Sequence, residues 1–391
     1  MNVPKLRFKE FNDYWIETKI QNVASVVGGG TPSTDEPKYW GNEINWFTPS
    51  ETGKTKYVAI SNRKISQDGL KNSSAKLLPK GTILLSSRAT VGEASILLNE
   101  ASTNQGFQSL IVNENNCNEF IYYLKYKYKR EMLIKSFGST FLEISKSNVE
   151  NIKIKIPSIE EQFKIANFLS LLDKKIELQS KKIEDLKLFK SSQISSVIDS
   201  LKCDEIELRE IGNFISGNAI GKEKIKESGV PIILYGDLYT KYWEVIDKVE
   251  QYTEDNEKYI KSKKNDLLFP TSTTVDSISL ISPSSINIDD VIYGGDLIVF
   301  RADYTRINSD FLSYQINHYK RKEFSKKAQG STIIHIHAED LLSSKVKLPN
   351  IEIQNLISKT FNILNKKIIK EEEKLNKLNN LKKGLMQSMF V

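Results

Sequence analysis

The chain has 391 residues, of which 39% are hydrophobic, so one to three domains with cores of their own are expected. Lys and Arg outnumber Asp and Glu by 56 to 49, a mild excess that permits a nucleic-acid partner without requiring one. The N-terminus has no apolar signal core, no apolar run of about 18 residues occurs, and Cys117 and Cys203 lack metal-ligand spacing. We therefore expect a cytoplasmic protein with no membrane partner and no metal site.

Two similar halves make up the chain. Pro157 and Pro349 lie 192 residues apart in the strings IPSIEEQ and LPNIEIQ. The same shift lays DKKI at Asp173 onto NKKI at Asn365, and GSTFLEI at Gly138 onto GSTIIHI at Gly330. Three more pairs match with short slips, which loops tolerate: KIQNVASVVGG with LREIGNFISGN, GTILLSSRATVG with NDLLFPTSTTVD, and SLIVNEN with DLIVFRA. The sequence therefore predicts an internal repeat in which each copy is a globular part followed by a helical part.

The globular parts, residues 1–156 and 202–347, are predicted to be α+β domains. Short runs rich in branched apolar residues and bounded by turn residues indicate strands at 81–87, 109–113, 149–157 and 290–300. Amphipathic segments at 118–137 and 309–328 indicate one main helix in each domain.

The helical parts, residues 157–201 and 348–391, each carry a heptad of apolar residues. The spacing of Ser158 and Glu161 behind Pro157 fits a capping box and predicts a helix start there. Non-heptad residues recur at matching places too, Gln179 with Glu371 and Lys190 with Lys382. Because neither helix can bury its stripe alone, we expect a coiled coil, the alternative being two unrelated helices docked on their own domains. The heptad residues are Leu169, Leu172, Ile176, Ile183, Leu186 and Val197, and Phe361, Leu364, Ile368, Leu375, Leu378 and Met389.

Motifs that would indicate catalysis are incomplete. TGKT at Thr52 lacks the first glycine of a phosphate-binding loop, and GNAIGKE at Gly217 is one residue short. GGGTPST at Gly28 does not spell a dinucleotide fingerprint, and no Asn-Pro-Pro-aromatic methyltransferase loop occurs. His335 and His337 alternate along a probable strand, where they are expected to line a surface or groove because a third metal ligand is not evident. We expect no catalytic residues and no cofactor on this chain.

These features together resemble the specificity subunits of Type I restriction–modification enzymes. The resemblance covers nearly the whole chain and is carried by KLRFKEFNDYW, VVGGGTPST, the duplicated P-x-I-E-x-Q, KKIE and KKGLMQSMF in this order. It implies two target recognition domains separated by two helices that form an antiparallel coiled coil. Each domain would read one half of a bipartite site in double-stranded DNA.

The resemblance also implies partner subunits. Two methyltransferase subunits would supply S-adenosylmethionine binding and methyl transfer, and two motor-nuclease subunits would add ATP- and Mg-dependent cleavage. Two hypotheses from other functional classes remain open. The chain could be a coiled-coil adaptor that binds only proteins, or a self-contained DNA methyltransferase or nuclease.

Candidate base readers are polar or aromatic residues on turns, since such side chains reach base edges in a groove. In the first half they are Thr31, Ser33, Trp46, Thr48, Ser50, Glu51, Ser86, Ser87, Arg88, Thr90, Asn104 and Gln105. In the second half they are Tyr235, Asp237, Thr271, Ser272, Thr273, Thr274 and Tyr293, with Lys326 and Lys327 as candidate phosphate contacts. Arg88 could pair with guanine through its guanidinium, whereas its counterpart Ser272 could not do so in the same way, which fits different half-sites. Turn hydrogen bonds for the hydroxyls, a core position for Trp46 and a solvated lysine pair are the competing interpretations.

Overall fold

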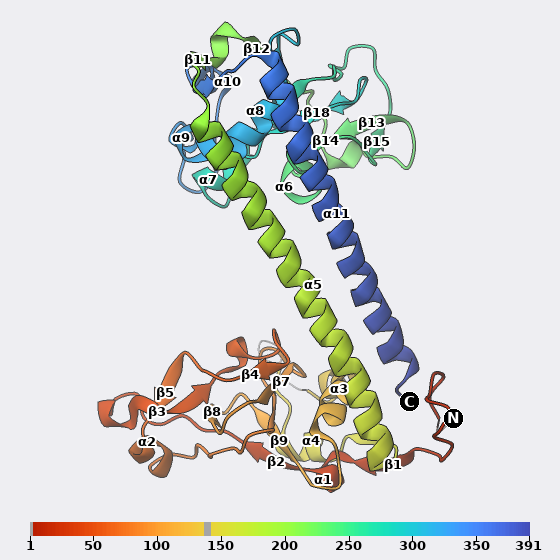
Figure 1. The fold of residues 1–391 in the computed structure, drawn as a ribbon. Helices are drawn as coiled ribbons and strands as arrows, with labels where there is room; N and C mark the ends of the chain where they lie inside the picture. The colour runs from red at the N-terminus through yellow and green to blue at the C-terminus, as the bar shows by residue number, and fades with distance from the viewer. Residues whose placement is uncertain (1–2, 137–141) are drawn as a thin grey trace. The chain divides into compact units, whose positions relative to one another are not determined.

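A computed structural model describes residues 3–136 and 142–391 (Figure 1). Residues 138–141 of the GSTFLEI match lie outside the described residues. The chain divides into two compact units, Met1–Leu178 with Leu375–Val391, and Gln179–Lys374. Both boundaries fall inside the long helices, so the domain limits 1–156 and 202–347 stay predictions.

The first unit is built on a five-stranded sheet of order β2-β9-β6-β7-β4 and a three-stranded sheet of order β5-β3-β8. A two-stranded ladder of β1 with β10 closes the domain where the chain enters and leaves it. The strands are β1 (Ile16–Lys19), β2 (Ala24–Gly28), β3 (Trp40–Phe47), β4 (Tyr57–Val58), β5 (Arg63–Ile65), β6 (Ile83–Leu85), β7 (Ala94–Leu97), β8 (Ser102–Thr103), β9 (Gln108–Val112) and β10 (Lys153–Ile156). The helices are α1 (Ile20–Val23), α2 (Gln67–Lys71), α3 (Asn118–Lys135) and α4 (Lys146–Glu150).

The second unit repeats this topology. Its sheets have the orders β12-β20-β16-β18-β14 and β15-β13-β19, closed by β11 with β22, and it adds a short ladder of β17 with β21. The strands are β11 (Glu205–Glu207), β12 (Gly212–Ser216), β13 (Val230–Ile233), β14 (Val245–Ile246), β15 (Tyr252–Thr253), β16 (Asp266–Pro270), β17 (Ser272–Thr273), β18 (Ser284–Ile286), β19 (Ile292–Tyr293), β20 (Leu297–Ala302), β21 (Ile334–His335) and β22 (Lys345–Lys347). The helices are α6 (Asp237–Thr240), α7 (Ser277–Leu280), α8 (Ser309–Gln315), the π-helical η5 (Ile316–Lys320), α9 (Arg321–Ser325) and α10 (Ala338–Leu342). The predicted internal repeat is therefore confirmed in the strand order itself.

Alternation along the central strand of each large sheet separates two cores. In β6, Ile83 and Leu85 face α3 and the long helices, whereas Leu84 faces the smaller sheet. In β16, Leu267 and Phe269 face the helices while Leu268 faces the other side. This period of two is what a strand buried on both faces requires.

The long helices are α5 (Ile159–Ser200) and α11 (Ile351–Ser388), within the predicted limits (Figure 1). The first unit's core joins the start of α5 to the end of α11. The second unit's core joins the end of α5 to the start of α11. The helices therefore run antiparallel, and all twelve heptad residues are buried or half-buried. Leu169 and Phe361 also enter the domain cores, so part of the heptad anchors each domain as well as the other helix.

Gln179 and Glu371, which the repeat makes equivalent, contact each other. The Gln179 Nε2 donates to the Glu371 carboxylate at 2.7 Å and to its backbone oxygen at 2.9 Å. This hydrogen bond, with ion pairs from Lys374 and Lys182, lowers the pKa of Glu371 to about 2. Among the described residues, none of the helices combines the length and apolar character that crossing a membrane requires.

Candidate nucleic-acid interface

Four loops of the first unit meet at one edge of its sheets. Strands β2 and β6 end there and the antiparallel β9 begins there, while the parallel β3 and β8 end together beside them. Backbone hydrogen bonds tie the loops to one another: Gly30 N to Thr103 O, Asn104 N to Phe47 O, and Ser87 N to Gly106 O, at 2.8 to 3.1 Å. The edge therefore presents segments 29–36, 48–52, 86–92 and 104–107 as one surface.

The glycine run after β2 is needed for close approach of this backbone. A Cβ at Gly29 would stand 2.1 Å from the Asn104 carbonyl oxygen, and one at Gly30 would stand 2.2 Å from Ser74. The Trp46 indole donates to the Gly30 carbonyl at 2.9 Å from a buried position. Trp46 thus holds the turn from beneath, which argues against direct contact with a base.

Most of the sequence-predicted residues of the first half lie on this edge at the surface. Thr31 donates to Gln105 at 2.5 Å, and Thr48 donates to Glu51 at 2.7 Å, so these pairs link neighbouring loops and turns. Fully buried members are Ser86 and Ser87 with Trp46; half-buried members are Thr48, Glu51, Arg88 and Asn104; exposed members are Thr31, Ser33, Ser50, Thr90 and Gln105. The exposed and half-buried residues of this set remain candidate contacts to DNA.

Arg88 projects from the turn after β6. Its Nη2 pairs with the Glu143 carboxylate at 2.8 Å, the two residues also form an isolated antiparallel bridge, and the Arg88 side chain is 44% exposed. Among the described residues its Nε has no hydrogen-bond partner. Glu143 therefore orients the guanidinium, and because the unpartnered Nε is buried, only the exposed part of the group is open to a base or phosphate.

The second unit presents the equivalent edge. The loops after β12, β13, β16 and β19 lie together because β13 and β19 are parallel and β20 runs antiparallel to both β12 and β16. Ser272 pairs with His335 here, in the place that Arg88 and Glu143 occupy in the first unit. The same cross-strand position therefore carries an arginine–glutamate ion pair in one unit and a serine–histidine pair in the other.

Two predicted residues of the second half are buried with structural partners. The Tyr293 hydroxyl donates to Asp266 at 2.8 Å, and burial together with that carboxylate raises the pKa of Tyr293. Asp237 accepts from the Leu234 amide at 2.9 Å. Thr271, Ser272, Thr273 and Lys327 are half-buried, while Tyr235, Thr274 and Lys326 are exposed. Lys327 donates to Ser343 at 2.6 Å, so Lys326 is the freer phosphate candidate of the two.

A groove of about 620 Å³ opens at this edge, lined by Thr271, Asp296, His335 and His337 among others. The prediction that the two histidines line a groove is thus confirmed. Asp296 was missed; it lies in a Gly-Gly-Asp turn with a positive φ of 56°, a turn signal in the sequence that says nothing of which face the side chain takes. In the described part of the chain no three His, Cys, Asp or Glu residues gather to hold a metal ion.

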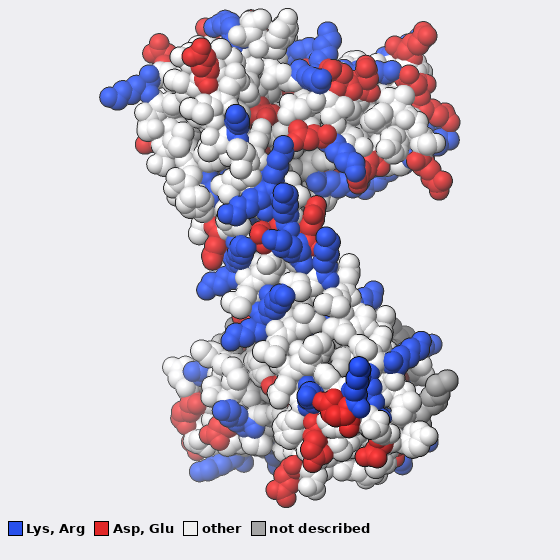
Figure 2. Space-filling model, turned by 45° about the vertical axis from the view of Figure 1, so that its right-hand side comes forward, with Lys and Arg blue, Asp and Glu red and all other residues white. Residues whose placement is uncertain are grey.

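Basic side chains are concentrated on the long helices. Between residues 359 and 383 helix α11 carries eight lysines against three glutamates. Figure 2 shows Lys and Arg gathered over the long helices. Exposed lysines such as Lys366, Lys367 and Lys370 suit sequence-independent attraction of phosphates.

The family described as "Type I restriction modification DNA specificity domain" matches the chain twice, at residues 12–188 and 201–380. The two matches coincide with the two copies of the repeat. The chain belongs to this family.

Relatives agree with this assignment. The chain is 43% identical over 176 residues to the MjaIX specificity subunit of Methanocaldococcus jannaschii, covering 44% of this chain and 41% of that one. It is 27% identical over 197 residues to the EcoR124I/EcoR124II specificity subunit of Escherichia coli, covering 46% and 48%. The chain thus spans less than half the length of either curated relative. The crystal structure of a Type I S subunit from M. genitalium shares the fold, with a TM-score of 0.61, 18% identity, and coverage of 100% and 99%.

If Arg88 pairs with a guanine, replacing it with alanine is expected to relax binding at a single base position of the DNA. A bidentate arginine–guanine contact is worth about 1–3 kcal/mol. Binding to a panel of single-base variants measures this directly. An even loss over all sequences, with a weaker salt dependence, would instead show that Arg88 contacts phosphate.

Proposed function

We propose that this chain is the DNA-reading subunit of a Type I restriction–modification complex in the cytoplasm, recognising a bipartite target. The observation that carries the proposal is the duplicated edge, four loops placed by the same strand order in each unit. Its equivalent positions differ in chemistry, as Arg88 with Glu143 differs from Ser272 with His335. Two such edges would read two different half-sites.

Physical reasoning favours a split target. One domain of this size reaches only a few base pairs, and each mismatched pair costs about 1–3 kcal/mol, too little to select one site in a genome. Two readers on one chain add their discrimination, while the base pairs between the half-sites go unread. The half-site spacing would be fixed by the helices, as it is by the dimer geometry of repressors.

Catalysis would belong to the partners. Two methyltransferase subunits would bring S-adenosylmethionine and two motor-nuclease subunits would bring ATP and Mg. The incomplete phosphate-binding motifs and the missing methyltransferase loop support a non-catalytic role for this chain.

The purified chain alone is expected to transfer no methyl groups, hydrolyse no nucleotide and cut no DNA. Mixed with cognate methyltransferase subunits, it should direct adenine methylation to a split site, which sequencing of methylated DNA would reveal. Methyl transfer by the chain alone would revive the enzyme alternative. No DNA binding even with the methyltransferase subunits would favour the adaptor.

A further inference from the structure

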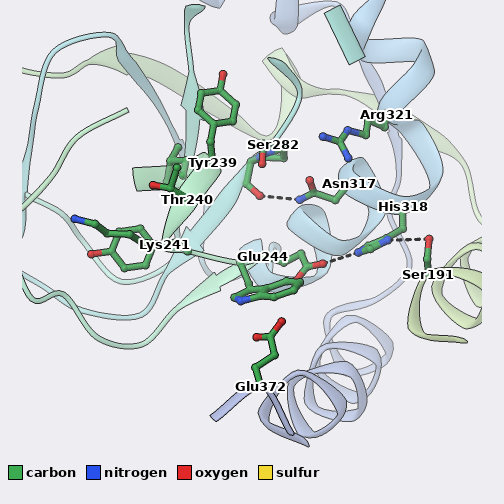
Figure 3. Close-up of a pocket in the computed structure, with 14 residues that line it drawn as sticks. Ser191, Tyr239, Thr240, Lys241, Glu244, Ser282, Asn317, His318, Arg321 and Glu372 are labelled. Carbon is green, nitrogen blue, oxygen red and sulfur yellow. Dashed lines mark hydrogen bonds and ion pairs between the residues drawn. The ribbon is translucent and has the colours of Figure 1, made fainter. Parts of the chain in front are cut away.

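A buried polar cluster joins the recognition domain of the second unit to the long helices. Lys190 of α5 has a side chain that is 2% exposed, and its Nζ lies 2.7 Å from the Glu244 carboxylate and 2.7 Å from the Asn365 amide oxygen. The His318 ring contacts two partners (Figure 3). Its Nε2 lies 2.6 Å from the same Glu244 carboxylate, and its Nδ1 lies 3.1 Å from the Ser191 hydroxyl. The charge of a helix lysine is therefore balanced by a carboxylate of the domain.

Burial alone would raise the pKa of Glu244, but the hydrogen bond to His318 and the charge of Lys190 outweigh it and hold the pKa below its usual range. Asn365 adds a hydrogen bond to the other Glu244 oxygen at 3.1 Å. Glu244 is thus ionised and fully engaged. A second acidic side chain placed beside Glu244 would have to share Lys190 as its counter-charge.

The first unit has the same junction with different charges. Here the helix lysine, Lys382, pairs with Asp173 of the facing helix at 2.5 Å, so the helices neutralise each other. The domain contributes Lys56, which pairs with its own Glu119 at 2.9 Å and donates to Ser170 at 2.6 Å. The ion pair of the helices and the ion pair of the domain are therefore each neutral without the other.

The positions correspond one to one. Lys56 and Glu244 each precede the edge strand of the large sheet, and their backbone oxygens accept from Ile96 and Ser285 in the paired strand. On the helices a shift of 192 residues relates Ser170 to Asn362, Asp173 to Asn365 and Lys190 to Lys382. We call Ser170, Asp173 and Lys382 the first seat, and Asn362, Asn365 and Lys190 the second seat. Because both seats hold a lysine, they differ only at the first two positions of each.

We propose that these charges make each recognition domain specific for its own seat, so that a domain transferred to the other end of the helices would not fit there. A first domain on the second seat would bring Lys56 beside Lys190, leaving Glu119 to serve two buried ammonium groups. A second domain on the first seat would bring Glu244, together with its own partner His318, beside Asp173, so that the two carboxylates would share a single lysine, Lys382. The first arrangement buries a positive charge without a partner at the second seat, and the second places an excess negative charge at the half-buried first seat; proteins tolerate both poorly. Exchanging the domains together with their seats would then exchange the order of the half-sites in the target, and this last step rests on the proposed function.

A cycle of four full-length chains tests the proposal. One is the natural chain. The second exchanges the domains between the closing ladders, residues 17–155 for 205–347. The third exchanges only the seats, through Ser170→Asn, Asp173→Asn, Asn362→Ser and Asn365→Asp. The fourth carries both exchanges. The second and third chains should melt about 5–10 °C below the natural one, and the fourth should melt at least about 5 °C above the second.

A matched control exchanges an uncharged, exposed pair related by the same shift, Leu171→Ile with Ile363→Leu. Added to the domain exchange, it should bring no recovery. The proposal is overturned if exchanging the domains alone leaves the melting temperature unchanged, or if the seat exchange recovers no more than the control does. Melting involves no DNA, so this outcome is independent of the proposed function. Methylation by the fourth chain with methyltransferase subunits then reports whether the half-sites have changed places.

Discussion

Replacing Glu244 with alanine is expected to lower the free energy of unfolding of the second unit by about 3–5 kcal/mol, the range for removing one partner of a buried ion pair. The variant leaves Lys190 buried beside Asn365, an amide that cannot neutralise it. Hydrogen exchange followed by mass spectrometry measures the loss, because it reports on each unit separately. Protection should fall in α8 and in the end of α5, and stay unchanged in α3.

Glu372 provides the control for this variant. It pairs with Lys187 at 2.7 Å near the same helices, but its side chain is 29% exposed, so Glu372→Ala should cost less than about 1 kcal/mol. Lowering the pH should also affect the stability of the natural chain more than that of the Glu244→Ala variant. A carboxyl whose folded pKa is lowered stabilises the fold above its unfolded pKa, about 4.3, and loses that contribution as pH falls further. The stability difference should therefore narrow below about pH 4.3; a difference independent of pH would show that Glu244 acts through packing alone.

Replacing residues 1–155 with the first domain of another family member is expected to change one half of the DNA target completely and leave the other half unaltered. Among the described residues, the strands that place the loops of each edge all belong to a single unit. The donor should carry a lysine and an acid in the places of Lys56 and Glu119, so that the junction stays paired. Methylome sequencing of cells that carry the new chain reads both half-sites at once.

The reciprocal replacement of residues 202–347 is the control and should alter only the other half. A replacement that changed both half-sites together would show that the edges do not read independently. The modular interpretation of the repeat would then have to be abandoned.

Periodic patterns in the sequence predicted the repeat and the long helices well. A heptad repeated with the same register, from Leu169 to Met389, constrains helix length and face because apolar burial dominates there. The reading edge was located less completely. Thr31 and Arg88, predicted as base contacts, lie at the surface of this edge, whereas Ser86, Ser87 and Tyr293, predicted with them, are buried by the fold. The local sequence around a residue at the end of a strand is the same whether its hydroxyl points into the core or toward solvent. Only the order of strands in the sheet distinguishes these two orientations.

The seats could not be predicted from the sequence, although one signal was present. Lys190 and Lys382 stood out as matching interruptions of the heptad. Their partners, Glu244 and Asp173, are 54 residues away in one case and 209 in the other, and one comes from the domain and the other from a helix. Pairing over such separations depends on tertiary structure, which local pattern does not encode.

The contact of Gln179 with Glu371 has a consequence for how the chain assembles. In a symmetric pair of identical half-length chains, a residue that contacts its own equivalent would face an identical side chain. Two glutamates there would repel, whereas Gln179 donates to Glu371 and Lys182 and Lys374 neutralise it. Because one polypeptide holds both copies here, one copy can carry the donor and the other the acceptor. The helices therefore recognise their partner within the same molecule, and pairing of α11 with α11 of a second molecule is disfavoured.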